Sequence, residues 1–412
     1  MKILLANPTA HPHIGGVENS LRYIGRELRE RGDEVEIFCL QLSPEEPLDD
    51  SIEGIPIHRC PYSLSRWPNR RLRDQVERTS AGVRPCLERF QPDRVWCRSA
   101  AMGLGISQSG FKGRLVQIFS TTAAMDSRGL FLQTKGADLG YRLKMAALYP
   151  LAHRAMRKIE KALLPRCQPV VFSENMRLQL TREYGEPAHK ARVIAPGVDS
   201  EVFSPATSSL REREIARTYG LSAEEPYILY VGRLSPAKNL PILFEAVSEL
   251  RNPKTRLVLV GEGRAEKRLR LLAKTLGLES RVLFVGKQTD LLPGFYGMAG
   301  VCVLPTNIES FGQVYLESMA CGTPVVGFGG EGSTFRTATA EIVADRLTGR
   351  VVATFDAGAL AEAIDWILEL PAEKYREMSA RCVEETVANY SWKRFVENVL
   401  DSVNVDEGSA SD

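Results

Sequence analysis

The sequence predicts an α/β protein made of two consecutive domains, each built around a parallel β-sheet. Short apolar runs alternate with helical segments along the chain, and this strand–helix–strand order is typical of parallel sheets. The alternation begins twice, once at residue 3 and again near residue 226. A chain of 412 residues also has room for two or three domains of ~100–200 residues.

The first series opens the chain. Buried strands are expected at residues 3–6 and 35–40, and a helix that ends at Gly32 is expected between them. The apolar positions of that helix recur along one face, at Val17, Leu21, Ile24 and Leu28. Further strands are expected at residues 94–97, 115–119 and 169–172.

The second series has the same order of elements. Helices are expected at residues 239–250 and 265–276, with a third after Gly312. Strands are expected at residues 227–231, 257–260, 282–284, 301–304 and 325–327.

These series define the expected domains. The first covers residues 1–195, and a helix at residues 390–404 is expected to pack back on it. The second covers residues 200–389. Two prolines and a glycine in the joining segment, VIAPGVDSEVFSP, are typical of a hinge. The polar tail, residues 405–412, is expected to be disordered.

The composition narrows the class of protein. Hydrophobic residues make up 44% and charged residues 25%, as in ordinary globular proteins, and no run approaches ~20 apolar residues. The eight cysteines form no C-x-x-C pair and no zinc spacing, which favours a reducing compartment. Residues 1–190 carry a basic excess and the rest an acidic one. A cytoplasmic protein without a signal peptide is therefore expected.

The strongest motif is ESFGQVYLESMACGTPVV, residues 309–326, which joins a strand end to a helix start. Gly312 allows close backbone approach, and free N–H groups at a helix N-terminus bind phosphate. Gln313 and Glu317 are four residues apart and share one helix face. A carboxylate there can accept two hydroxyl hydrogen bonds; it also suits the helix dipole without any ligand.

A second motif, VGRLSPAKNL, spans residues 231–240. Arg233 and Lys238 follow a strand end and precede a helix, where two cations can neutralise a diphosphate leaving group. A solvated loop with two surface cations is the other interpretation.

A third motif, HIGGVEN, places Gly15 and Gly16 before the first helix. It resembles half of a dinucleotide fingerprint but lacks G-x-G-x-x-G, so a tight turn explains it equally well.

No metal site is expected. The sequence has no Asp-x-Asp at a strand end, and Asp49 and Asp50 are expected in a polar loop. No cofactor motif is complete either.

Together and in this order, the motifs resemble family four of the retaining glycosyltransferases (glycosyl transferases group 1). The similarity covers nearly the whole chain and includes PGVDSEVF, LVLVGEGR, VLFVGK and SWKRF. The resemblance implies the GT-B fold, with two Rossmann-like domains whose parallel sheets face each other across a cleft. It also implies metal-independent transfer of a hexose-type sugar from a UDP- or GDP-sugar with retention of configuration.

The resemblance assigns roles to residues. Arg233 and Lys238 hold the diphosphate, Glu317 the ribose diol, and Glu309 hydroxyls of the transferred sugar. Backbone near the donor comes from two glycine-containing segments and from the helix start, at Gly15, Gly16, Gly286, Lys287, Phe311, Gly312 and Gln313.

The acceptor side departs from the family pattern. The segment IFSTTAAMDS contains Asp126 but no preceding His, and RVWCRSA lacks the family's His near residue 97. The sequence therefore does not decide whether the acceptor is a small metabolite, a lipid-linked sugar or a polysaccharide. A nucleic-acid partner is not expected. Residues 141–164 are basic, and Pro150 is expected to interrupt their helix. Such a stretch suits either peripheral contact with the inner membrane face or a solvated helix face.

Three other functions remain open: a nucleotide-sugar epimerase or sugar phosphorylase on the same architecture, a non-catalytic nucleotide-sugar-binding protein, and a dinucleotide oxidoreductase. The four charged residues of the second half argue against a binding module, since binding alone does not need all of them. The incomplete glycine fingerprint argues against the oxidoreductase.

Overall fold

The structure is a computed structural model that describes the chain outside residues 13–15, 63–67, 124–138, 223, 330–336 and 409–412. The described chain forms two compact units. Unit 1 contains the described residues up to Ala195 together with the chain from Trp392, and unit 2 is Pro196–Ser391.

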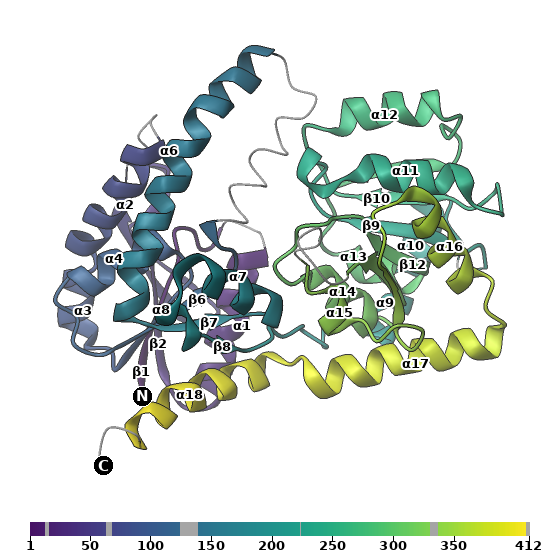
Figure 1. Cartoon of the computed structure of the whole chain (residues 1–412). Helices are drawn as coiled ribbons and strands as arrows, with labels where there is room; N and C mark the ends of the chain where they lie inside the picture. The colour runs from purple at the N-terminus through teal and green to yellow at the C-terminus, as the bar shows by residue number, and fades with distance from the viewer. Residues whose placement is uncertain (13–15, 63–67, 124–138, 223, 330–336, 409–412) are drawn as a thin grey trace. The chain divides into compact units, whose positions relative to one another are not determined.

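Unit 1 is built on a sheet of eight described strands in the order β3-β4-β2-β1-β5-β6-β7-β8 (Figure 1). All neighbours are parallel except the edge pair β3 and β4. The strands are β1 (Lys2–Ala6), β2 (Glu34–Gln41), β3 (Asp49–Ile52), β4 (Ile55–Pro61), β5 (Arg94–Cys97), β6 (Arg114–Phe119), β7 (Gln168–Val171) and β8 (Arg192–Val193).

Helices cover both faces of this sheet. Leu4 and Ala6 of β1 pack in one apolar cluster with residues of α2, α4 and α6. The alternate residue, Leu5, faces Gly25 of α1. The first helices are α1 (Gly16–Glu30), α2 (Pro68–Gly82), α3 (Arg84–Phe90) and α4 (Ala100–Gln108). They are followed by α6 (Leu139–Leu163), η1 (Leu164–Arg166), α7 (Glu174–Tyr184), α8 (Glu186–His189) and α18 (Trp392–Gly408).

Unit 2 has a fully parallel sheet, in the order β11-β10-β9-β12-β13-β14 over the described residues. Strands β10, β12 and β13 are buried throughout, as expected for parallel strands covered by helices on both faces, whereas the edge strands β11 and β14 are partly exposed. The strands are β9 (Tyr227–Val231), β10 (Leu257–Val260), β11 (Val282–Gly286), β12 (Ala299–Leu304), β13 (Val325–Phe328) and β14 (Gly349–Val352).

The helices of unit 2 alternate with these strands, and α11, α12 and α16 enclose a large part of its apolar core. In chain order they are α9 (Pro205–Ser209), α10 (Glu212–Tyr219), η2 (Pro236–Lys238), α11 (Leu240–Glu249), α12 (Glu266–Thr275), α13 (Leu292–Gly297), α14 (Gln313–Ala320), α15 (Thr339–Ile342), α16 (Ala357–Leu368) and α17 (Ala372–Asn389).

The chain passes between the units at two places that lie side by side. Val198 forms a parallel bridge with Ser391, and its N–H donates to the carbonyl of Tyr390 at 2.9 Å. From there α18 packs on unit 1, where Trp392 stacks on Tyr23 with ring centroids 5.8 Å apart. The helix expected from Trp392 therefore packs on the first unit.

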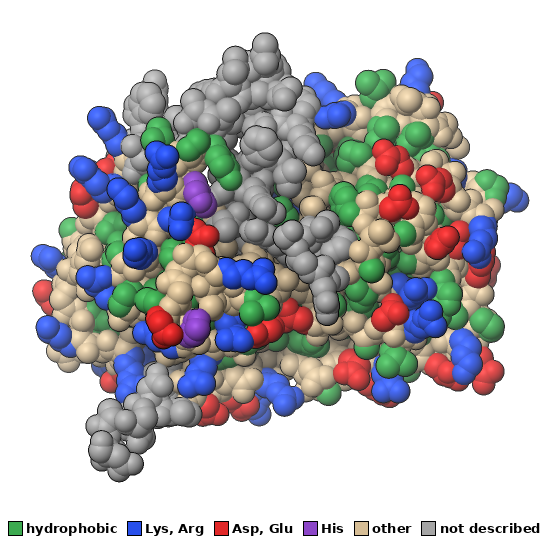
Figure 2. Space-filling model, viewed as in Figure 1, with side chains coloured by type: hydrophobic (Ala, Val, Ile, Leu, Met, Phe, Trp, Pro, Cys, Tyr) green, Lys and Arg blue, Asp and Glu red, His purple; other side chains and the backbone are tan. Residues whose placement is uncertain are grey.

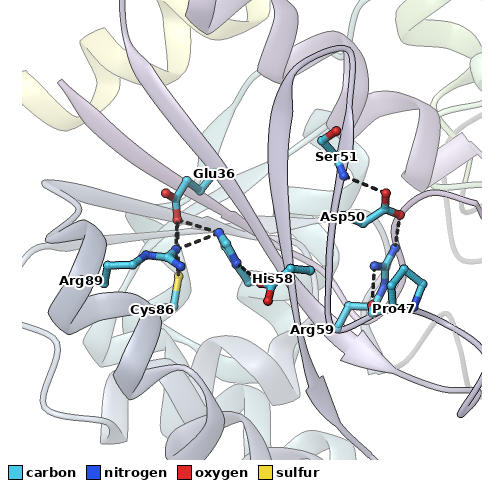
Figure 3. Close-up of polar contacts among 9 residues, drawn as sticks. Glu36, Pro47, Asp50, Ser51, His58, Arg59, Cys86 and Arg89 are labelled. Carbon is cyan, nitrogen blue, oxygen red and sulfur yellow. Dashed lines mark hydrogen bonds and ion pairs between the residues drawn. The ribbon is translucent and has the colours of Figure 1, made fainter.

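Three local predictions are wrong. Asp49 and Asp50 lie in the edge strand β3, which pairs with β4, rather than in a loop. Asp49 contacts His58 at 2.6 Å. Asp50 contacts the buried Arg59 at 3.2 Å (Figure 3). Pro150 does not interrupt α6. The helix α18 continues through Gly408, so residues 405–408 are helical rather than disordered.

Basic side chains are spread over unit 1 on the face drawn in Figure 2, rather than gathered in a patch. The part of α6 with described side chains shows a similar mixture. Arg157 pairs with Glu183, and Ile159 and Glu160 are buried. No helix in the described part of the chain is long and apolar enough to cross a membrane.

Candidate functional site

Each sheet has one position where its strand order reverses. In unit 2 this position lies between β9 and β12, because the chain runs from β9 outward to β10 and β11 and then returns to β12. In open α/β sheets, ligands bind beyond the carboxyl ends of the strands at such a reversal. The loops after β9 and β12 carry Arg233, Lys238 and Glu309, so the motifs lie at this position.

The loop after β9 is held by close backbone contacts. Gly261 and Gly263 adopt φ of 141° and 159°, and an added Cβ would lie 2.0 Å from the Gly232 carbonyl oxygen and 2.3 Å from that of Leu234. Only glycine allows both approaches. Tyr230 also donates from its hydroxyl to the carbonyl of Arg233 at 3.0 Å. The backbone of Arg233 is therefore fixed, while its side chain is exposed.

Two side-chain contacts join the loop after β9 to the loop after β12. Lys238 Nζ lies 2.5 Å from Glu309 Oε2, and Asn239 donates to the side-chain oxygen of Asn307 at 2.9 Å. Lys238 and Glu309 are 71 residues apart in sequence. The fold thus brings together a predicted phosphate-binding cation and a predicted sugar-binding carboxylate.

The loop after β12 leads into α14. Gly312 precedes this helix with φ of 91°, and its carbonyl accepts from the N–H of Tyr315 at 2.8 Å. No side chain caps the helix at Gly312. The first N–H groups of α14 therefore point out beside Glu309 without a side-chain cap, as a phosphate-binding helix start requires. Phe311 is buried and packs edge-on against Tyr390 with centroids 6.1 Å apart.

Glu317 lies one turn further along α14. Its Oε2 accepts a hydrogen bond from the hydroxyl of Tyr296 at 2.7 Å. Burial raises the pKa of Glu317 to about 7, while the hydrogen bond from Tyr296 acts in the opposite direction. A carboxyl with a pKa near 7 is only partly ionised at neutral pH, and hydrogen bonds from hydroxyl donors favour its ionised form.

The remaining predicted donor residues are placed apart from these loops or against protein. The side chain of Gln313 donates to the carbonyl of Gly197, so it holds the joining segment. Gly286 ends β11 with φ of 81°, and the N–H of Lys287 lies 3.4 Å from Glu262 Oε1. Gly286 and Lys287 therefore border the loop after β10.

The glycine loop belongs to unit 1. Gly16 begins α1, whereas Gly15 lies outside the described residues, as does Asp126. Arg59, buried and bound to the Pro47 carbonyl at 2.8 Å, also donates to the carbonyl of His11 and so anchors the start of this loop.

Sequence reasoning missed Tyr296, Asn239 and Asn307, which orient the predicted residues. Asn239 has φ of 50°, a conformation that asparagine tolerates and that the AKNL sequence suggests in hindsight. Tyr296 follows no pattern that marks it. The described residues contain no group of three or more His, Cys, Asp or Glu side chains placed to hold a metal ion.

Two family models match the chain. The model for glycosyltransferase family 4 matches residues 14–202, and the model for glycosyl transferases group 1 matches residues 211–385. The chain is also similar to a D-inositol 3-phosphate glycosyltransferase of Mycobacterium marinum, with 34% identity over 241 residues that form 57% of this chain and 49% of the relative. A protein of the same name from Acidothermus cellulolyticus is 35% identical over 236 residues, 54% of this chain and 49% of that one. The match thus spans about half the length of the curated relatives.

Solved structures share the whole architecture. Sucrose-phosphate synthase from Thermosynechococcus elongatus has a TM-score of 0.78 at 23% identity, and the comparison covers 100% of both chains. HepE from Anabaena, in complex with UDP-glucose, has a TM-score of 0.73 at 19% identity over 98% of this chain and 100% of that one. The chain therefore has the GT-B fold. It belongs to family 4 of the glycosyltransferases.

Proposed function

We propose that the protein is a retaining glycosyltransferase that moves a hexose-type sugar from a UDP- or GDP-sugar to an acceptor hydroxyl without a metal ion. The observation that carries this proposal is the contact between Lys238 and Glu309 beside the uncapped start of α14. It places a cation, a carboxylate and free backbone N–H groups together at the strand reversal of unit 2. The names of the relatives support the general class of reaction.

The cations act on the leaving group. Departure of a nucleoside diphosphate places negative charge on its terminal phosphate, and fixed positive groups stabilise that charge as it develops. Lys238 and the N-terminus of α14 are held in place before the ligand arrives. Arg233 has an exposed side chain on a fixed backbone, so it can reach the phosphates from the other side of the loop.

The carboxylates act on hydroxyl groups. Glu309 is paired with Lys238, and a carboxylate accepts hydrogen bonds from neighbouring sugar hydroxyls. Glu317 serves the ribose diol in the same way once it is ionised. In this proposal the departing phosphate takes the proton of the acceptor hydroxyl, which attacks from the face that the phosphate leaves.

A donor screen tests the proposal. We expect a UDP- or GDP-sugar to raise the unfolding temperature, since a ligand at 100 times its Kd stabilises by ~2.7 kcal/mol. Lys238→Ala should lose this effect, and Lys254→Ala, an exposed lysine of the same unit, should keep it. No stabilisation by any nucleotide sugar contradicts the proposal.

Product analysis separates the alternatives. An epimerase converts the nucleotide sugar alone, a phosphorylase needs inorganic phosphate, and a binding protein converts nothing. Stabilisation by NAD but not by UDP or GDP would indicate an oxidoreductase. The anomeric proton coupling of the product, read by NMR, tests retention. Vesicle sedimentation tests the lipid contact predicted for residues 141–164.

A further inference from the structure

The strand order of unit 1 also reverses once, between β1 and β5. A cavity of about 280 Å³ lies there, lined by residues that follow β1, β5 and β6 at their carboxyl ends. This volume corresponds to about nine water molecules, enough for one sugar or polyol ring. All residues that line the cavity belong to unit 1.

Arg98, directly after β5, is the cation of this cavity. Its Nε and Nη1 atoms are screened from solvent and have no hydrogen-bond partner, and no described carboxylate forms an ion pair with it. The guanidinium stacks over Phe172 at 5.4 Å from the ring centroid, which fixes its orientation. Burial lowers the pKa of Arg98 to about 10, although the charge of Glu18 acts in the opposite direction.

Arg98 is half-buried, but two of its guanidinium nitrogens are screened from solvent without a partner, which is costly and calls for a functional explanation. Two carboxylates line the cavity, but neither forms an ion pair with Arg98, and both accept hydrogen bonds from protein donors. Glu18 accepts from the hydroxyl of Thr9 at 2.5 Å. Glu160 accepts from the N–H of Ala123 at 3.0 Å and from the hydroxyl of Tyr184 at 2.5 Å.

Two further features define the ligand. Helix α4 begins at Ala100 on the cavity wall, so its N-terminal dipole adds to the positive potential at Arg98. Gln117 also lines the cavity; its buried Oε1 lies against Gly103 of α4, which leaves its amide nitrogen to meet a hydroxyl group. The cavity thus offers one site for an anion and at least one for a hydroxyl.

We propose that this cavity binds the anionic group of a small hydroxylated acceptor, a phosphate or a carboxylate, with Arg98 as its cationic partner. The assignment of this ligand as the acceptor rests on the proposed function; the anion site itself does not. Arg98 positions the acceptor and takes no part in bond breaking. Charged small acceptors are therefore favoured over neutral polysaccharides.

Calorimetric titration of the full chain with glucose 6-phosphate, glucuronate, glucose and inorganic phosphate tests the site. We expect glucose 6-phosphate or glucuronate to bind more tightly than glucose and than inorganic phosphate. Whichever of the two binds more tightly identifies the anion. Equal binding of glucose and both charged sugars overturns the proposal, and binding of inorganic phosphate as tight as that of both charged sugars overturns its hydroxylated part.

Two variants assign the effect to Arg98. Arg98→Gln should weaken binding of the charged sugar roughly 10- to 100-fold, as loss of a charge-assisted hydrogen bond does. Arg84→Gln, at an exposed arginine of α3 outside the cavity, should leave it unchanged. The unfolding temperature of Arg98→Gln reports whether the variant folds. Unchanged binding in folded Arg98→Gln overturns the proposal.

UDP and GDP titrations separate this proposal from the proposed function. Arg98→Gln should bind either nucleotide as the wild type does, because the nucleotide is assigned to unit 2. If the variant loses nucleotide affinity, the anion belongs to the donor and the acceptor assignment is wrong. If no protein binds a nucleotide while the charged sugar binds through Arg98, the proposed function fails and the anion site stands.

Discussion

Glu317 offers a test in which pH reports directly on one side chain of unit 2. Burial raises its pKa to about 7 from the usual 4.5. Both oxygens of the Glu317 carboxyl can accept hydrogen bonds from a ribose diol only when the carboxyl is ionised. The nucleoside diphosphate should therefore bind to the ionised protein, and its affinity should rise with pH.

The size of this effect follows from the pKa. A carboxyl group that titrates near 7 is roughly one-tenth ionised at about pH 6 and nine-tenths ionised at about pH 8, so affinity should rise about tenfold over that interval. Glu317→Gln removes the titration but keeps the shape. The diphosphate also titrates in this range, but equally with both proteins. The ratio of wild-type to variant affinity therefore isolates Glu317.

Without nucleotide, the fold itself should respond in the opposite direction. Because the folded pKa of Glu317 lies above its unfolded value, its contribution to stability is complete below about pH 4.5 and is lost as pH rises through about 7. Relative to Glu317→Gln, the wild type should lose at most about 3 kcal/mol of unfolding free energy between about pH 5 and pH 8. The side chain keeps some exposed surface, so this is an upper bound.

Calorimetric titration across this pH range and urea unfolding of both proteins provide the measurements. An affinity ratio that stays constant from about pH 6 to pH 8 refutes the assignment of Glu317 to the ribose. A constant ratio together with the expected stability change would show that the carboxyl is buried but does not meet the nucleotide.

Three further predictions follow from the same structure. Lys238→Ala and Arg233→Ala should each lower kcat by ~10²–10³ in the folded protein, whereas Lys254→Ala should not; wild-type turnover in either contradicts the role in leaving-group stabilisation. Turnover should persist in excess chelator, and complete loss that manganese or magnesium restores would show a metal requirement. Trp392→Ala should destabilise unit 1 in urea unfolding by about 3–5 kcal/mol, the usual cost of truncating a buried Trp, because Trp392 is buried against Tyr23. A loss under about 1 kcal/mol would contradict its packing role.

Most apolar strands were predicted from sequence, but β4, β8 and β14 were not, and neither was the polar strand β3. The predicted strands at 94–97, 227–231 and 257–260 agree with β5, β9 and β10 at both ends. Strand β3 was missed because its sequence, DDSI, has no apolar alternation; its backbone pairs with β4 and its aspartates are held by side chains of that strand. Long-range pairing overrides local preference at such an edge.

The candidate site divides in the same way. Residues in motifs at strand ends, such as Lys238 and Glu309, could be assigned to one region because parallel strands end at one edge of a sheet. Their direct contact depends on the turn geometry of two loops and was not predictable. Arg98 was missed altogether, because a single arginine after a strand has no motif; only burial without a partner distinguishes it.

The second passage of the chain, from Ser391 to Trp392, has a consequence for biosynthesis. Unit 1 receives α18 only after Pro196–Ser391, the described part of unit 2, has been translated. Until α18 has been made, unit 1 lacks the helix that packs Trp392 against Tyr23. A nascent chain paused near residue 391 would therefore expose the apolar surface of unit 1 that α18 covers, and this surface is where a chaperone would be needed.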